Sequence, residues 1–408
     1  MNVSVAVISD LHIGSGAKAK DFSLVGTDAV IDDYLAEFRK FVAEEAINAD
    51  YLLVPGDITN SACQPEFDLA SERISDVASI LRVPETKILF CPGNHDVDWA
   101  IIKAFEGLKH PESHLIKSKY LNFMEAGIFR KNLAAAKGRF DEAPYLVVWE
   151  FDEVLVCALN TSVFDGPDKK PHCGEVRPDQ LAEIDRKLGG IGRNEKLKIF
   201  IFHHHPIQYL DVTFNAPDFS IMSNAAGLLD VISKHQFDFV IHGHKHIPRF
   251  KMEIKDDGHP LNILCAGSFS ASLDHKYFEA VGNNFHLVDF HDRCPDSKYV
   301  RGSVRSWTHF SGRGWTPSLR RAGVERKQNF GAFLPRPQLV NKLTRSFEAE
   351  LSGAQFIQWS GFLEKYPEFR YFTNETLRAS LKEVSESMGL ILHEIDALSL
   401  DQLVILKG

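Results

Sequence analysis

Five short clusters in the 408-residue chain carry side chains of the kinds that bind metal ions. The clusters mix carboxylates, an amide and imidazoles, which suit Mn²⁺, Fe²⁺ or Zn²⁺ better than Ca²⁺ or a thiolate-seeking metal. In chain order they are Asp10-Leu11-His12, Gly56-Asp57-Ile58-Thr59-Asn60, Gly93-Asn94-His95-Asp96, His203-His204-His205-Pro206 and Gly243-His244-Lys245-His246.

Each cluster alone has an ordinary explanation. An Asp-x-His pattern arises by chance, Gly, Asp and Asn form turns, and neighbouring histidines occur on surfaces or buried in loops. All five clusters, however, follow predicted strands, and open α/β sheets place their sites beyond the carboxyl ends of strands. Their joint occurrence therefore favours one site over five coincidences.

Local spacing gives a first idea of how these side chains are presented. Alternation along an extended segment places Asp10 and His12 on the same side, where they can hold one ion. A glycine precedes Asp57, Asn94 and His244 and permits a sharp turn at the strand end.

The elements around these clusters predict an α/β fold. Short apolar runs alternate with helical patterns, and Asp152-Glu153 between two apolar runs indicates a hairpin, so the sheets are expected to be mixed. Strands are predicted at residues 3–8, 51–54, 87–91, 145–151, 154–159, 198–202, 237–241 and 261–265, and helices at 28–48, 99–132 and 177–188.

The ordered clusters resemble the signature of the calcineurin-like metallophosphoesterases, over roughly residues 1–315. The resemblance implies a four-layer αββα sandwich, in which two mixed β-sheets lie between helices, and two divalent transition-metal ions, with Mn²⁺ expected first and Fe or Zn²⁺ as alternatives. It implies that the first ion is held by Asp10, His12, Asp57 and His246, and the second by Asp57, Asn94, His204 and His244, with Asp57 as the bridge.

His204 is chosen because it stands two residues before Pro206, the spacing of the family pattern. His203 and His205 are its alternatives, since a shift of one residue would exchange them. His95 is expected to protonate the leaving group and Asp96 to fix the His95 ring by a hydrogen bond, against a structural role for His95 and a plain turn role for Asp96.

The C-terminal part lacks these clusters. Glycines and prolines interrupt any regular period near residues 312–337, so a linker is predicted at 316–338. Helical spacing of Leu377, Leu381, Val384 and Met388 predicts a small, mainly helical appendage at 339–408.

Composition and cysteine usage indicate a cytoplasmic protein. The chain is 44% hydrophobic and 25% charged, no apolar run reaches the roughly 18 residues that span a bilayer, and residues 3–8 are too short for a secretory signal. The six cysteines form no Cys-x-x-Cys pair and are expected to be reduced.

Positive charge gathers in one segment of a chain whose formal net charge is −9. Residues 298–345 hold eleven Lys or Arg against one acid, interleaved with aromatic residues. This composition is compatible with binding a nucleotide or single-stranded nucleic acid, whereas the plainer interpretation is a solvated loop or an interface.

Together these features predict a metallophosphoesterase whose substrate is a phosphate ester, and a phosphodiester of nucleotide or nucleic-acid type in particular. The alternatives are a phosphomonoesterase or phosphoprotein phosphatase, and a non-catalytic scaffold that retains the metal site. The sequence leaves the oligomeric state open.

Overall fold

The computed structural model describes residues 2–24, 31, 33–105, 112–168, 171–191, 195–209, 221–255, 258–273, 281–320, 323–394 and 400–408. The chain forms two compact units. The larger unit comprises Ser4–Leu287 and Thr308–Thr316, and the smaller comprises Met1–Val3, Val288–Trp307 and Pro317–Gly408.

The first large sheet is built around β1 (Val3–Val7), which pairs in parallel with β2 (Tyr51–Pro55), and β2 pairs in parallel with β3 (Ile88–Cys91). All five residues of β2 are buried, as expected of a parallel strand covered on both faces. The sheet continues beyond β1 through β10 (Asn283–Arg293), β11 (Val300–Phe310) and β12 (Gly314–Pro317), and β13 (Lys327–Phe330) pairs antiparallel with β11.

The second large sheet has the order β4-β5-β6-β7-β9-β8. Its inner pairs are parallel, whereas β4 and β8 at the edges run antiparallel to their neighbours, which confirms the predicted hairpin at Asp152-Glu153. The strands are β4 (Leu146–Glu150), β5 (Val154–Leu159), β6 (Leu197–Ile201), β7 (Phe239–His242), β8 (Arg249–Ile254) and β9 (Pro260–Cys265).

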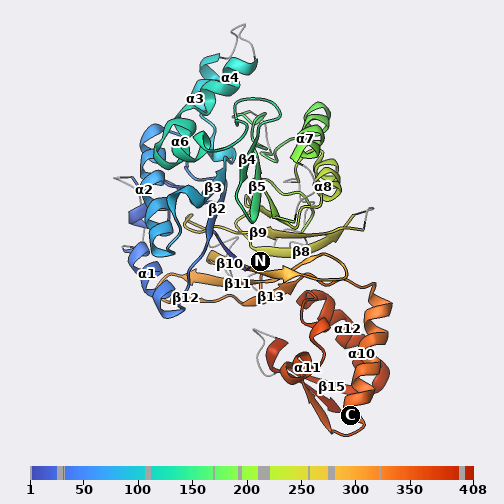
Figure 1. The fold of residues 1–408 in the computed structure, drawn as a ribbon. Helices are drawn as coiled ribbons and strands as arrows, with labels where there is room; N and C mark the ends of the chain where they lie inside the picture. The colour runs from blue at the N-terminus through green and yellow to red at the C-terminus, as the bar shows by residue number, and fades with distance from the viewer. Residues whose placement is uncertain are drawn as a thin grey trace. The chain divides into compact units, whose positions relative to one another are not determined.

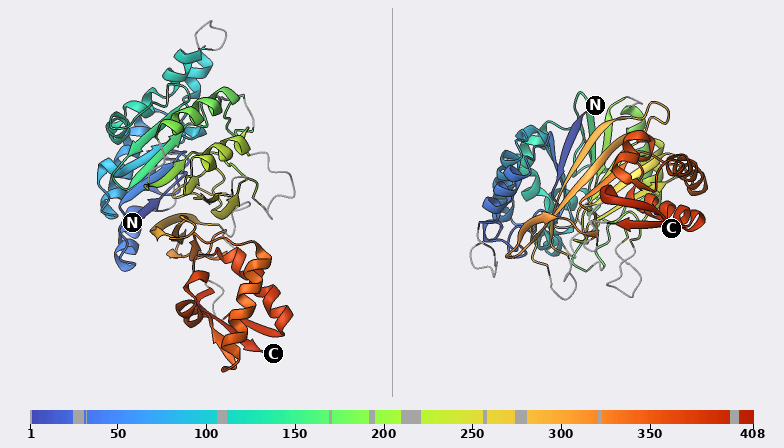
Figure 2. Two further views of the ribbon diagram at one scale, coloured as in Figure 1. Left: turned by 45° about the vertical axis from the view of Figure 1, so that its right-hand side comes forward. Right: turned by 90° about the horizontal axis from the view of Figure 1, so that it is seen from below.

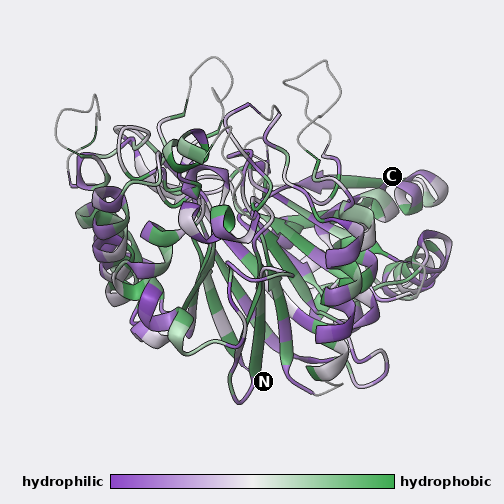
Figure 3. Ribbon diagram, turned by 90° about the horizontal axis from the view of Figure 1, so that it is seen from above, coloured by the Kyte–Doolittle hydropathy of each residue, from purple (hydrophilic) through white to green (hydrophobic). Residues whose placement is uncertain are grey.

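Helices cover the outer sides of the larger unit. Figure 1 shows α1 (Tyr34–Glu44), α2 (Gln64–Ile80) and α6 (Gly127–Ala134) beside β2 and β3, and α7 (Pro178–Ile191) and α8 (Ala225–Lys234) beyond β4 and β5. The two views of Figure 2 show the same arrangement of helices and strands. Figure 3 shows hydrophobic strands between helices that carry hydrophilic segments. The predicted sandwich of two mixed sheets flanked by helices is confirmed.

Some helices differ from their predicted extents. The predicted helix at 99–132 is divided into four, whereas α7 begins at Pro178, where proline fits the first helical turn. α2 and α8 were not predicted. The four are α3 (Trp99–Phe105), α4 (Glu112–Lys119), α5 (Leu121–Glu125) and α6.

The smaller unit contains helices and a small sheet. Its helices are α10 (Arg336–Leu351), α11 (Trp359–Lys365) and α12 (Asn374–Met388). They share a buried core with an antiparallel sheet of order β14-β16-β15, which helical periodicity did not predict. The sheet's strands are β14 (Phe356–Gln358), β15 (Leu390–Glu394) and β16 (Leu403–Lys407).

β13 lies inside the segment predicted as a linker, and the boundaries at 315 and 339 stay a prediction. Among the described residues, no helix is both long and apolar enough to cross a membrane.

Candidate metal centre

The predicted site residues meet where strands of both large sheets end. Asp10, Asp57 and Asn94 follow β1, β2 and β3 of the first sheet, and the His203 and His244 clusters follow β6 and β7 of the second. The backbone N–H of His244 donates to Asp10 Oδ1 at 2.9 Å, which links the two sheets directly.

One group of donor atoms consists of Asp10, His12 and His246. The Nε2 atoms of His12 and His246 lie 3.0 Å apart, and His246 Nε2 lies 3.4 Å from Asp10 Oδ1. Imidazole nitrogens that converge in this way are suited to a shared cation. This group is the set predicted for the first ion without the bridging residue Asp57.

A second group consists of His203, His204 and His244, and Asn94 adjoins it. Asn94 Oδ1 lies 3.1 Å from His244 Nδ1. Asp57 faces both groups, because its Oδ2 lies 3.1 Å from His203 Nε2 and 3.7 Å from His12 Nε2. This position between the groups is the one that a bridging carboxylate requires.

The three consecutive histidines differ in their partners. His203 Nδ1 donates to the carbonyl oxygen of Pro55 at 2.9 Å, which leaves Nε2 facing Asp57. His204 Nδ1 lies 2.7 Å from Thr161 Oγ1. His205 Nε2 lies 3.8 Å from Cys265 Sγ, within a further buried group of His205, His242 and Cys265. Only His203 and His204 therefore belong to the group around His244.

The backbone is strained at several of the predicted metal ligands. Asp10, His12 and Asp57 have φ of 49°, 49° and 48°, and His244 and His246 have φ of 85° and 58°. The expectation that Asp10 and His12 lie on an extended segment was wrong, since both are left-handed. Non-glycine residues in this region are uncommon and gather at functional sites.

The glycines before the donor residues act in two ways. Gly56 has φ of 87°, the conformation expected for a sharp turn. Gly93 instead permits close approach, because a Cβ there would lie 2.2 Å from Asp57 Oδ1. A Cβ at Gly243 would likewise lie 2.3 Å from Asp10 Oδ2.

His95 and Asp96 do not contact each other as expected. His95 Nδ1 donates to the carbonyl oxygen of Asn60 at 2.9 Å, so a backbone group and not Asp96 orients this ring. Asp96 accepts hydrogen bonds from the backbone N–H groups of Ile58, Thr59 and Gly93 and from the Thr59 hydroxyl. Asp96 thus joins the loops after β2 and β3.

Electrostatics favour metal-binding protonation states at some of these residues and not at His203, where burial lowers the pKa but Asp57 outweighs it and raises the pKa to about 9. Burial lowers the pKa of His12 and of His244 well below the usual value, so both imidazoles are neutral with a free lone pair. Burial alone would raise the pKa of Asp57, but His203 and His95 outweigh it and the net shift is downward. Asp57 is therefore ionised.

The donor set fits divalent cations. The Nε2 atom of His204 is buried and has no hydrogen-bond partner among the described residues, and the Nε2 atom of His203 faces the Asp57 carboxylate at 3.1 Å. Buried polar atoms are rarely left unpaired, and a cation between these nitrogens and the carboxylates would satisfy them.

A family model described as calcineurin-like phosphoesterase matches residues 3–248. The chain belongs to this family. A probable cyclic nucleotide phosphodiesterase of Xenorhabdus bovienii (strain SS-2004) is 27% identical over 189 residues, which cover 45% of this chain and 69% of that protein.

Solved structures with a similar fold include two phosphatases. A purple acid phosphatase from seeds of yellow lupin (Lupinus luteus) has 13% identity and a TM-score of 0.47, and the match covers 77% of this chain and 52% of that one. A dimetal phosphatase from Danio rerio has 13% identity and a TM-score of 0.41, covering 74% and 95%. The chain thus spans about half the length of the lupin protein.

Several residues around the calcineurin-like centre were missed in the sequence. The Ser9 hydroxyl donates to Asp10 Oδ2 at 2.6 Å, and Thr161 and Pro55 contact the histidines. Ser9 directly precedes Asp10, so its position in the sequence could have indicated a role at the site. Thr161 and a further imidazole, His172, come from a loop after β5 that carries no motif.

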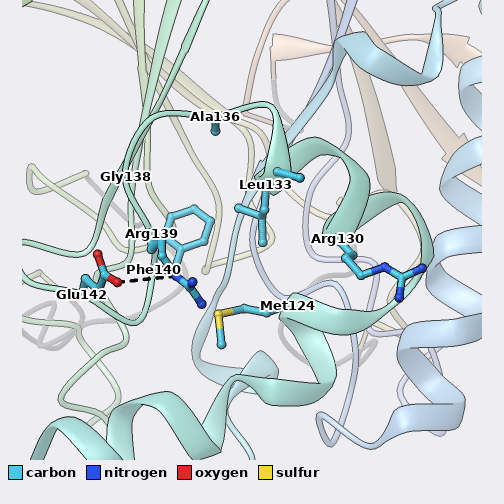
Figure 4. A pocket seen from close by; sticks show the side chains of 9 residues that line it. Met124, Arg130, Leu133, Ala136, Gly138, Arg139, Phe140 and Glu142 are labelled. Carbon is cyan, nitrogen blue, oxygen red and sulfur yellow. Dashed lines mark ion pairs between the residues drawn. The ribbon is translucent and has the colours of Figure 1, made fainter.

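A cavity of about 510 Å³ lies apart from these residues, among α5, α6 and the loop before β4. Figure 4 shows Arg139 and Glu142 at its wall, joined by an ion pair of 3.7 Å. The cavity's lining includes none of the predicted site residues.

Proposed function

We propose that this chain hydrolyses phosphate esters, and phosphodiesters in particular, at a dinuclear centre whose bridge is Asp57. The observation that carries the proposal is the position of Asp57, whose Oδ2 atom faces the His12 and the His203 imidazoles at 3.7 and 3.1 Å.

The protein's own residues would hold two ions in the predicted arrangement, with one revision. Asp10, His12 and His246 serve one ion, and Asn94 and His244 serve the other, with Asp57 shared. We assign His203 to this ion in place of His204, and the support is that its Nδ1 is fixed by Pro55 and its Nε2 faces the bridge.

When held by these residues, two divalent ions would supply an activated water molecule and would neutralise charge on the phosphoryl group. His95 would then protonate the leaving oxygen. Because Nδ1 is committed to Asn60, Nε2 is the nitrogen that exchanges a proton with substrate. Asp96 acts by holding two loops together and not by touching substrate.

Support for a diester comes from the Xenorhabdus relative, a probable cyclic nucleotide phosphodiesterase. A nucleotide is therefore the first substrate class to test. The basic segment gives less support than its composition suggested, since Trp307 and Phe330 are buried and are not exposed stacking surfaces.

The test compares bis-p-nitrophenyl phosphate with p-nitrophenyl phosphate in the presence of Mn²⁺, and metal content is measured in the same preparations. We expect two ions per chain, faster hydrolysis of the diester, and loss of activity on chelation that added Mn²⁺, Fe²⁺ or Zn²⁺ restores. Faster hydrolysis of the monoester would contradict the diester preference. Full activity without metal would contradict the mechanism, and a metal-loaded protein without turnover would indicate a scaffold.

A further inference from the structure

A second set of aromatic and polar side chains adjoins His95. Trp99 begins α3 four residues after His95, and the two ring centroids lie 6.4 Å apart. The imidazole of His172 stacks on Trp99 with a centroid separation of 5.1 Å and an interplanar angle of 22°. The rings of His95, Trp99 and His172 therefore lie in series.

Asp165 fixes the orientation of His172. The Nδ1 atom of His172 donates to Asp165 Oδ1 at 2.8 Å, and the Asp165 side chain is only 3% exposed. The His172 side chain is 18% exposed, so it remains accessible. With Nδ1 engaged, Nε2 is the ring nitrogen that a ligand can reach.

Asp165 also lines a cavity of about 300 Å³. Its wall includes Ile102, which lies three residues after Trp99 on α3, together with Val163 and Phe164. A volume of this order is at the lower end of the range for small-molecule sites. The wall combines these apolar side chains with charged ones, which include Lys119 and Arg177.

We propose that Trp99 and His172 form the binding surface for the organic group on the leaving side of the ester, and that the cavity beside Asp165 receives the distal part of this group. The inference rests on the proposed function. If His95 protonates the leaving oxygen, the group attached to that oxygen extends from His95 toward Trp99.

The chemistry of these residues indicates the class of leaving group. The face of the Trp99 indole that His172 does not cover is a flat apolar surface of the kind that favours aromatic and heteroaromatic rings. His172 Nε2 adds a hydrogen bond to a polar atom on such a ring. The site therefore selects a planar ring that carries a hydrogen-bonding group, over a small alkyl alcohol.

Two phosphonates test this inference without turnover, because their carbon–phosphorus bonds resist hydrolysis. 4-Nitrobenzylphosphonate carries a ring with polar nitro oxygens, and methylphosphonate carries the phosphonate alone. Calorimetry of the Mn²⁺-loaded protein should show that His172→Ala weakens binding of the nitrobenzyl compound about five- to tenfold, the contribution of one hydrogen bond. Methylphosphonate binding should be unchanged.

Matched variants separate this role from a structural one. His172→Gln, which retains a donor near the position of Nε2, should keep most of the affinity, and His114→Ala on the exposed surface of α4 should keep all of it. Melting curves should be alike. Equal weakening for both phosphonates, or no weakening for either, would overturn the inference while leaving the proposed function intact. Wild-type protein that binds neither phosphonate and hydrolyses no ester would overturn the proposed function as well.

Discussion

The carboxylate of Asp57 faces donor atoms of two groups, and this has a direct consequence for metal content. Asp57→Ala should lose both ions, because two cations without a shared anion repel each other. His12→Ala should lose mainly one. Elemental analysis after gel filtration measures this, with Asp68→Ala on α2 as the control. Equal losses of one ion in both site variants would contradict the bridge.

Elemental analysis can also distinguish which of His203 and His204 binds the second ion. Removing the imidazole that binds the second ion should lower the metal content to about one ion per chain, the loss expected when one ligand in four is removed. We expect this for His203→Ala. His204→Ala should retain two ions, and the reverse result would restore the original prediction for His204.

His95 is expected to affect rate without affecting metal. His95→Ala should retain both ions and lose on the order of 10²- to 10⁴-fold in kcat, as for other proton donors. The loss should be smaller for a p-nitrophenolate leaving group than for an alkyl alcohol, since an activated leaving group needs little protonation. An equal loss for both would argue against the acid role.

At this scale, the sequence predicts which residues gather but not how each is oriented. Asp10, Asp57 and His244 follow buried strands, so their convergence follows from sheet geometry. Which imidazole among His203, His204 and His205 faces Asp57 depends on the backbone after β6, where local spacing gives no register. The partner of His95 was missed because the carbonyl of Asn60 has no side-chain signature.

Among the elements, β10 carries a buried titratable group. Burial lowers the pKa of His286 to about 4 from 6.5, although its hydrogen bond to the Ala266 carbonyl opposes this shift. The unfolded chain therefore binds a proton that the folded chain does not, so stability falls as pH falls through this range.

Urea unfolding at two pH values measures this effect. Between about pH 7 and pH 5 the wild-type protein should lose about 2 kcal/mol of unfolding free energy through this group. His286→Gln keeps an N–H donor but does not titrate, so its loss should be smaller by this amount. His114→Gln serves as the control, and an unchanged pH dependence in His286→Gln would contradict the assignment.

The predicted elements were recovered where burial produces short apolar runs. β2, β5 and β6 are buried along their whole length and matched the sequence closely. β11 was missed because it contains Gly302 and several polar residues, and it is stabilised by its place in the sheet. α2 was missed because its buried positions are interspersed with charged residues.

For the whole molecule, some of the positive charge in the basic segment at 298–345 is paired with nearby acids, and nucleotide or nucleic-acid binding by this segment stays a prediction. Arg301 pairs with Asp292, and Arg305 pairs with Asp289 at 2.9 Å, so part of its positive charge is neutralised within the smaller unit. Arg321, which also belongs to this segment, lies outside the described residues. Composition alone did not reveal these pairs because the acids come from β10.

A buried pair in the same unit gives a stability test. Glu325 Oε2 accepts hydrogen bonds from Arg378 at 3.1 Å and from Asn374 at 2.8 Å, and the Glu325 side chain is 6% exposed. Glu325→Ala should cost about 3 kcal/mol, because it leaves buried donors unpaired. Urea unfolding measures the loss, with the exposed Glu348→Ala as the control.

The kinetics of the same variant test the role of the segment. If these residues serve stability, KM for a nucleotide should stay unchanged in Glu325→Ala at low and at moderate ionic strength. A salt-dependent change in KM with unaltered stability would favour substrate steering instead.

The strand-end loops that meet at Asp57 come from two separate sheets, β1 and β2 on one side and β6 and β7 on the other. Bound ions would therefore connect the strand-end loops of both sheets. Loss of the ions would release loops that are far apart in the sequence. Amide hydrogen exchange should then report one opening event. After chelation, protection at Asp10, Asp57, His203 and His244 should fall together, while the middles of the same strands stay protected.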